Sequence, residues 1–199
     1  YPKLPLNCTN SRLKCALPTE KGNLVRVSEE PYVSFVNESN PTDALRAVFR
    51  RHASGVSVIT MNDNAGAPVG FTATSMTSLG ANPPLASFNV ASGASSWSAM
   101  NTADYVAIHT LGVENIELAK KMAAAHELRF ADDDWTRGAH NLPIFSDASA
   151  ILIAKVREIH SVESNAVVIV EIQEGLIGDE ADALLYHQRA YKATGVTLE

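Results

Sequence analysis

The alternation of hydrophobic and polar residues predicts mainly β-structure in the middle of the chain. Residues 56–61 form a β-rich run that ends at a turn-forming cluster of Asn, Asp and Gly residues. Residues 68–78 alternate apolar side chains with glycine and threonine at a period of two, which is typical of a half-buried strand. Residues 82–84, Asn-Pro-Pro, interrupt the chain because proline cannot donate to a sheet ladder, and a third run follows at residues 85–90. These runs predict an antiparallel β-meander.

Helices and further strands are predicted on either side of this meander. Residues 42–52 form a helix with Thr42 as its N-cap and with Leu45, Val48 and Phe49 on one apolar face. Residues 116–126 form a second helix, in which Glu117 and Lys121 have the spacing of an i,i+4 ion pair. We also predict strands at residues 105–111, 150–160, 166–174 and 184–191, a short helix at 96–101 and a tight connection at 163–165. The predicted fold class is mostly β with peripheral helices.

Length and composition indicate one globular domain preceded by an extension. Of the 199 residues, 46% are hydrophobic and 19% are charged, which is typical of a soluble globular protein. We expect this domain at residues 41–199. Residues 1–40 contain both cysteines, Cys8 and Cys15, and show no sustained periodicity. They are read as an extension specific to the lineage, as a dimer arm or as a partly artificial sequence, and the domain itself has no cysteine for a disulfide or metal site.

Charge and motifs exclude several classes of protein. The net charge of −6 argues against a nucleic-acid-binding surface, and no apolar run approaches the roughly 20 residues needed to span a bilayer. A cytoplasmic location is therefore the default expectation. The acidic run Asp132, Asp133 and Asp134 has no further ligand at a supporting spacing, so we expect a solvated loop and no metal site. The sequence contains no dinucleotide-binding glycine motif, no P-loop and no Gly-x-Ser-x-Gly elbow.

Small hydroxyl residues are the most suggestive chemistry in the chain. Residues 72–78 carry three threonines and two serines, and Gly70 and Ala73 leave room for a flat ligand near the backbone. Ser92, Ser95 and Ser96 form a second group that suits a phosphate or another anion. Composition alone favours an ordinary threonine-rich strand and an ordinary serine-glycine turn.

Several segments in order nevertheless resemble one family. The first are LRAVFRRHASGVSVIT, APVGFTATSMTSLGANPPLASFNV and SSWSAM. The next is LRFADDDW, with Arg129, Phe130 and Trp135 at the positions of an Arg-Phe-Ala-Gly-x-x-Trp pattern, followed by NLPIF and LLYHQRAY. Over residues 42–195 the chain resembles the flavin reductase-like family.

The resemblance implies a fold, a cofactor and a reaction. The fold would be a six-stranded antiparallel Greek-key split β-barrel of the FMN-binding type, forming a homodimer with the flavin in a groove at the interface. The reaction would be hydride transfer from NADH or NADPH to N5 of FMN, with FAD as a possible flavin. Reduced flavin would then serve a partner monooxygenase. Hydride transfer requires no general acid or base, so no catalytic side chain is predicted.

The same resemblance assigns the flavin-binding residues. Four residues, Thr72, Ala73, Thr74 and Ser75, would line the isoalloxazine and the ribityl chain. Phe88, Asn89 and Val90 would lie along the neighbouring strand. Ser95, Ser96 and Trp97 would close on the phosphate end, and Phe130 would also contact the cofactor.

The chain departs from the family pattern at the nicotinamide site. The family carries Gly-Asp-His between its two long late strands, where this sequence has Glu163, Ser164 and Asn165. Asn165 can donate a hydrogen bond but cannot become cationic or transfer a proton. Asn165, His187 and Tyr191 are therefore the candidate nicotinamide-binding residues. Two alternatives stay open: a flavoprotein that holds FMN tightly for another substrate or electron carrier, and a non-catalytic flavin-binding barrel.

Overall fold

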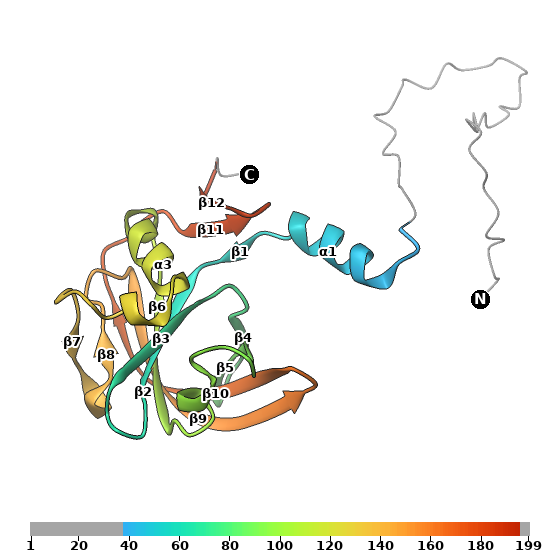
Figure 1. Ribbon diagram of the computed structural model, residues 1–199. Coiled ribbons are helices and arrows are strands. Elements are labelled where there is room, and N and C mark those ends of the chain that lie inside the picture. The colour runs from blue at the N-terminus through green and yellow to red at the C-terminus, as the bar shows by residue number, and fades with distance from the viewer. Residues whose placement is uncertain (1–37, 196–199) are drawn as a thin grey trace, which may run out of the picture. The chain divides into compact units, whose positions relative to one another are not determined.

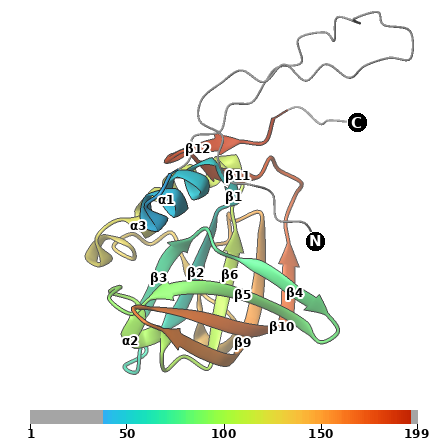
Figure 2. The same ribbon diagram turned by 90° about the vertical axis from the view of Figure 1, so that its right-hand side faces the viewer.

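The computed structural model describes residues 38–195, and residues Pro41–Glu199 group into one compact unit. The extension at residues 1–37, with Cys8 and Cys15, lies outside the described residues. The unit is mostly β with few helices, as predicted. Its main element is a seven-stranded antiparallel sheet in the order β3-β2-β6-β9-β10-β5-β4 (Figures 1 and 2). The strands are β2 (Ser57–Asn62), β3 (Pro68–Ala73), β4 (Thr77–Ala81), β5 (Pro84–Ala91), β6 (Tyr105–Thr110), β9 (Ala150–Val162) and β10 (Asn165–Ile177).

The large sheet has seven strands in place of the six that the resemblance implied. The predicted strand at residues 68–78 is two strands, and the predicted strand at residues 184–191 lies outside this sheet. β3 pairs with β2, whereas β4 pairs with β5, so consecutive strands form the two opposite edges of the sheet. Residues 74–76 cross from one edge to the other. The apolar-polar alternation covers only residues 69–74, and the hydroxyl residues that follow it carry no signal of the change of partner.

The prediction of a single strand at residues 184–191 is wrong. It is a hairpin of β11 (Leu184–His187) and β12 (Ala190–Ala193), which joins β1 (Ser54–Gly55) in a separate three-stranded sheet. The turn residues Gln188 and Arg189 have φ values of 52° and 64°. Such turns normally carry Asn or Gly, so this sequence gives no turn signal. A third, two-stranded sheet contains β7 (Thr136–Arg137) and β8 (Pro143–Ile144).

The helices differ from the prediction mainly at their ends. α1 (Pro41–Arg51) begins at Pro41, one residue before the expected N-cap, since proline is favoured in the first turn of a helix. α2 (Trp97–Met100) is short, as expected. α3 (Ile116–Ala123) ends three residues early, because Ala124 has an extended conformation. Short 3₁₀ helices at Val113–Asn115, His126–Leu128 and Ala139–Asn141 complete the described elements.

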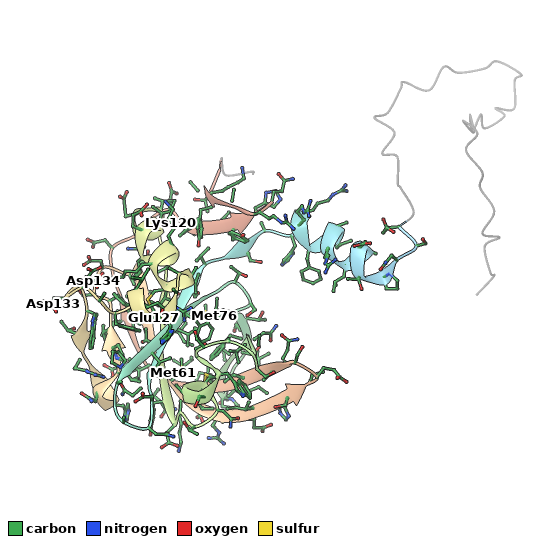
Figure 3. All side chains as sticks on the ribbon, in the orientation of Figure 1. Met61, Met76, Lys120, Glu127, Asp133 and Asp134 are labelled. Carbon is green, nitrogen blue, oxygen red and sulfur yellow. The ribbon has the colours of Figure 1, made fainter. Side chains whose placement is uncertain are left out.

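Charges around α3 pair differently from the prediction. Glu117 pairs with Lys120 at 2.7 Å and not with Lys121. Lys121 instead binds Asp132 and Asp134 in the acidic loop. Figure 3 shows Asp133 and Asp134 at the outer side of the molecule, on the loop before β7. Residues 38–195 contain no group of three His, Cys, Asp or Glu side chains placed to hold a metal ion.

The core lies on both sides of the seven-stranded sheet. Inside the curve of the sheet, Phe88, Ile59 and Met100 belong to one buried cluster. Outside it, Val58 and Met122 belong to a second cluster, which lies under α3 and the segment around Leu142. β2 is buried on both faces, which explains why residues 57–61 form a continuous buried run. Within the described part of the chain, no helix is long and apolar enough to cross a membrane.

Candidate functional site

A cavity of about 440 Å³ lies at the seam where residues 74–76 connect the two edges of the sheet. Its walls come from the end of β3, the end of β5, the loop before α2 and the last turn of α3. The lining residues are Phe71, Thr72, Ala73, Thr74, Ser75, Asn89, Val90, Ala91, Ala94, Ser95, Ser96, Met122, Ala123 and Arg129.

Eight of the eleven predicted flavin-binding residues line this cavity. They are Thr72, Ala73, Thr74, Ser75, Asn89, Val90, Ser95 and Ser96. The other three do not line it. Phe88 is fully buried in the inner cluster, and Trp97 packs against the same cluster. Phe130 belongs to the outer cluster and stacks on Phe145 with ring centroids 5.8 Å apart.

Two hydroxyl groups of the lining hold the walls together. The Thr72 hydroxyl donates to the carbonyl oxygen of Ala119 at 2.7 Å, which fixes α3 against β3. The Ser75 hydroxyl oxygen accepts a hydrogen bond from the Asn89 N–H at 2.9 Å, which joins the crossing segment to β5. The side chains of Thr74 and Ser95 are exposed and make no hydrogen bond within residues 38–195. These two hydroxyls are therefore available to a ligand.

Arg129 is the one charged residue of the lining, and it was not predicted as a ligand-binding residue. Its Nη1 donates to the carbonyl oxygen of Gly70 at 2.7 Å. Its Nε and Nη2 both donate to the carbonyl oxygen of Ala124, at 3.0 and 2.8 Å. Because a guanidinium has five N–H donors, these bonds leave two donors unused. No carboxylate forms an ion pair with Arg129 in the described part of the chain.

Burial and a nearby carboxylate act in opposite directions on this group. Desolvation lowers the pKa of the Arg129 guanidinium, and the charge of Glu127 raises that pKa in part. Arginine stays protonated in proteins, so the cavity wall carries a fixed positive charge. In the sequence, only the LRF segment points to Arg129, because it places this residue in the family pattern. That pattern does not assign Arg129 a role in ligand binding.

Gly70 has a different role from the predicted one. A Cβ atom at this position would lie 2.5 Å from Cε of Met122, 2.9 Å from the carbonyl oxygen of Ile59 and 3.2 Å from Phe130. The space above Gly70 is thus filled by α3 and Phe130 and is not open to a flat ligand. Gly70 instead allows α3 to pack closely on β3 and presents its carbonyl oxygen to Arg129.

The candidate nicotinamide residues lie in two separate places. Asn165 is the first residue of β10 and pairs with Ala91 of the cavity lining, so the turn contains only Glu163 and Ser164. His187 and Tyr191 belong to the small sheet of β1, β11 and β12. Burial and Tyr186 raise the pKa of the Tyr191 phenol, while Lys120 lowers it in part. None of the three residues lines the cavity.

The lining residues fit a planar, anionic ligand of cofactor size. The volume lies within the range of about 300 to 1,000 Å³ that is typical of small-molecule sites. The lining combines small apolar side chains, hydroxyl and amide groups and one fixed cation. It contains no Asp, Glu, His, Lys or Cys side chain, so no lining side chain is a general base or an activated nucleophile.

Comparison with known proteins agrees with this chemistry. The model of the flavin reductase like domain matches residues 49–195. An NADH:FMN oxidoreductase from Rhodococcus qingshengii is 38% identical over 154 residues, covering 73% of this chain and 78% of that protein. The reductase component of 4-hydroxyphenylacetate 3-monooxygenase from Pseudomonas aeruginosa is 26% identical over 152 residues, covering 74% and 89%.

A solved structure supports the same assignment. The flavin reductase domain protein from Arthrobacter sp. FB24 superposes with a TM-score of 0.76 at 44% identity, covering 79% of this chain and 98% of that chain. The family match spans the whole seven-stranded sheet and every residue of the cavity lining. This chain therefore belongs to the flavin reductase like domain family.

Proposed function

We propose that this protein is a flavin reductase that transfers hydride from NADH or NADPH to FMN, with FAD as the second flavin. The observation that carries the proposal is the seam cavity, which combines free hydroxyls with one unpaired cation in a chain of this family. A bound flavin supplies the redox chemistry, since its ring accepts the hydride. The name of the Rhodococcus relative, NADH:FMN oxidoreductase, supports NADH and FMN as the first pair to test.

The protein's own residues bind and orient the flavin in this proposal. The small side chain of Ala73 leaves the wall flat, and Thr74 and Asn89 offer hydrogen bonds to the polar edge of the ring. Ser95 and Ser96 bind the phosphate, and the charge of Arg129 favours an anionic ligand over a neutral one. Three aromatic residues outside the lining pack in the core next to the cavity walls and hold them in place: Phe88, Trp97 and Phe130. Asn165, next to Ala91 at the rim, orients the nicotinamide amide.

The same proposal covers the type of barrel, the oligomeric state, the protein partner and the location. We infer that the seven-stranded sheet corresponds to the split barrel of the FMN-binding type and that two copies form a homodimer. Reduced flavin leaves for a partner monooxygenase, which is supported by the name of the Pseudomonas relative as a monooxygenase reductase component. A cytoplasmic location, where NADH and NADPH are supplied, completes the proposal.

Two measurements on the purified full chain test the activity. Titration with FMN and with riboflavin measures flavin affinity, and oxidation of NADH and NADPH at 340 nm with added FMN measures turnover. We expect saturable binding and flavin-dependent oxidation. Tight FMN that stays bound without NADH or NADPH oxidation would instead support the carrier flavoprotein, and a chain without flavin affinity would contradict the proposal.

A pair of variants tests the phosphate placement. Replacing both Ser95 and Ser96 with alanine should weaken FMN more than riboflavin, because only FMN carries the phosphate. Ser98→Ala is the matched control, since Ser98 lies on α2 outside the cavity lining. Equal weakening of both flavins would show that this loop does not bind the phosphate.

A further inference from the structure

A second cavity, of about 190 Å³, lies between α1 and the β11–β12 hairpin, and we call it the α1 pocket. Figures 1 and 2 show α1 next to this hairpin, and the Gln188 N–H donates to the carbonyl oxygen of Arg50 at 3.1 Å. The lining includes three arginines, Arg46, Arg50 and Arg189, and contains no Asp or Glu. The volume is below the range of about 300 to 1,000 Å³ that is typical of small-molecule sites, so the pocket suits one chemical group and not a whole cofactor.

The cations of the α1 pocket are only partly neutralised by the protein. Arg46 pairs with Asp43 at 3.5 Å, whereas Arg50 and Arg189 form no ion pair among residues 38–195. The elements around the pocket, α1, β1 and the β11–β12 hairpin, carry five Lys and Arg residues and one acidic residue, in a chain with a net charge of −6. Arg46 and Arg50 also have i,i+4 spacing, at which like charges destabilise a helix. A bound anion would relieve this repulsion.

The turn that carries Arg189 has an unfavourable backbone conformation. Gln188 and Arg189 have φ values of 52° and 64°, in the left-handed region that side chains other than Asn and Asp rarely adopt. Strain of this kind is concentrated at active sites and ligand-binding sites. The hydrogen bond from Gln188 to Arg50 fixes the turn against α1. The strained turn therefore brings the third guanidinium to the pocket.

Stabilisation of the helix explains only part of this charge. Cations in the last turn of a helix interact favourably with its dipole, which accounts for Arg50 and Arg51. It does not account for Arg189, which lies outside the helix. The carbonyl oxygens at the end of α1 do not repel an anion unopposed, because the Phe49 carbonyl accepts from the His52 N–H at 3.3 Å and the Arg50 carbonyl accepts from Gln188.

We propose that the α1 pocket binds a phosphate monoester, held by the guanidinium groups of Arg46, Arg50 and Arg189. Guanidinium groups bind phosphoryl oxygens through paired N–H donors, which makes arginine the preferred residue for this group. The two imidazoles of the lining supply further N–H donors. Two aromatic rings of the lining, Phe49 and Tyr186, contact the organic part of the ligand. This site goes beyond the proposed reductase activity and does not depend on it.

Two sources supply this chemistry: the 2′-phosphate of NADPH and a separate phosphorylated metabolite. The strands connect the two cavities, because Ala73 of the seam cavity pairs with Ser57, and Ser54 pairs with Tyr186 of the α1 pocket. Paired residues lie about 5 Å apart and three residues span at most about 11 Å, so the Cα atoms of Ala73 and Tyr186 lie within about 22 Å. A dinucleotide reaches over such a distance, so the experiment distinguishes the two sources.

Isothermal titration of the full chain, in phosphate-free buffer and without flavin or nicotinamide nucleotide, tests the site. The probe is adenosine 2′-monophosphate, and adenosine is the matched ligand without the phosphate. We expect saturable binding of the probe and at least tenfold weaker binding of adenosine. Arg189→Gln should weaken the probe at least tenfold. Arg51→Gln is the control, because Arg51 lies on α1 outside the lining, and it should change the affinity by less than twofold.

The seam cavity is a second place for a phosphate, so Arg129→Met separates the two sites. It should leave the affinity for adenosine 2′-monophosphate unchanged. Weakening by Arg129→Met and not by Arg189→Gln would overturn the proposal and place the phosphate in the seam cavity. A parent chain that does not bind the probe, or equal weakening by Arg189→Gln and Arg51→Gln, would also overturn it. Circular dichroism confirms that every variant is folded.

Competition against the bound probe then identifies the source. Displacement by NADP⁺ and not by NAD⁺ identifies the 2′-phosphate of the nicotinamide nucleotide as the natural ligand. Displacement by neither nucleotide supports a separate phosphorylated metabolite. Equal displacement by both would overturn the proposal, because the pocket would then not recognise a phosphate monoester. No arm measures turnover, so failure of this site and failure of the reductase proposal are separate results.

Discussion

Two polar regions of this molecule belong to the same sheet, and their hydrogen-bonding groups are used in opposite ways. Around His109 on β6, each ring nitrogen is bonded within the protein: Nδ1 donates to the Val58 carbonyl oxygen and Nε2 accepts from the Phe145 N–H, both at 3.1 Å. In the seam cavity, Thr74, Ser95 and two donors of Arg129 remain available. The hydrogen-bonding groups around His109 are all bonded within the protein and stabilise the fold. Those of the cavity are free to bind a ligand.

The difference follows from the position of each region in the sheet. His109 is fully buried because β6 is a central strand, and a buried polar group costs free energy unless it is bonded. The cavity is lined by the ends of β3 and β5 and by residues 74–75, and the Thr74 and Ser95 side chains in it are exposed. Substitutions near His109 should therefore change the free energy of unfolding, and substitutions in the cavity should change ligand affinity.

The largest effect is expected for His109→Ala. It leaves the Phe145 N–H buried without its partner, removes one of the bonds to the Val58 carbonyl and creates a cavity, so the free energy of unfolding should fall by about 3 to 5 kcal/mol. Urea denaturation followed by circular dichroism measures the change. His126→Ala, at an exposed position, is the control and should change stability by less than about 0.5 kcal/mol. A loss below about 1 kcal/mol for His109→Ala would show that water replaces both bonds.

The same imidazole should make stability depend on pH. Burial lowers the pKa of His109 from 6.5 to about 4, and its hydrogen bond to Val58 offsets this in part. Between these values the unfolded chain binds the proton and the folded chain does not, so stability rises with pH. The contribution, about 3 kcal/mol, is fully present above pH 6.5 and is lost as pH falls toward 4. Urea midpoints from pH 4 to 8 measure it, and in His109→Gln this part of the dependence should disappear.

Gly70→Ala tests the close packing of α3 on β3 beside the cavity. The new methyl group would meet Met122 and the Ile59 backbone, which should cost about 1 to 3 kcal/mol of unfolding free energy. Displacement of α3 should also move Ala124 away from Arg129 and weaken FMN. Gly93→Ala is the control, because no atom lies within 4 Å of its added Cβ. Equal stability of both variants would mean that α3 adjusts without strain.

Arg129→Met should weaken an anionic ligand more than a neutral one, and it also removes three hydrogen bonds to backbone carbonyls. Loss of the cation should weaken FMN about tenfold, or about 1.4 kcal/mol, and riboflavin by less than twofold. Isothermal titration with both flavins measures the contrast. Arg137→Met is the control, since Arg137 is a second arginine bonded to carbonyl oxygens but lies outside the cavity lining. Equal weakening of FMN and riboflavin would place the phosphate away from Arg129.

The smallest effect is expected for substitutions of Asn165, which pairs with Ala91 at the rim of the cavity. Asn165→Ala should lower kcat/KM for the nicotinamide nucleotide by at most tenfold, because a neutral hydrogen bond contributes about 0.5 to 1.5 kcal/mol. Asn165→His should raise kcat/KM, and neither variant should change the FMN dissociation constant. Ser161→Ala on the same hairpin is the control. If both Asn165 variants match the parent in nicotinamide kinetics, Asn165 serves only the β9–β10 connection.

Local patterns predicted the parts of the fold that depend on near neighbours. The buried run of β2, the long strands β9 and β10 and the short helix α2 lie within three residues of their predicted bounds, since alternation and breaker residues act over a few positions. The order of motifs identified the family and placed eight residues in the cavity. These predictions needed no knowledge of which strand pairs with which.

Tertiary structure alone decided the features that depend on distant partners. Residues 68–78 divide into β3 and β4 because their pairing partners, β2 and β5, lie at opposite ends of the sheet order. The space beside Gly70 is filled by Met122, which lies 52 residues further along the chain. Arg129 reaches the cavity because the carbonyls of Gly70 and Ala124 hold its guanidinium. The sequence shows each of these residues only beside its chain neighbours. Folding brings Gly70, α3 and Arg129 together, and their contacts form the wall of the site.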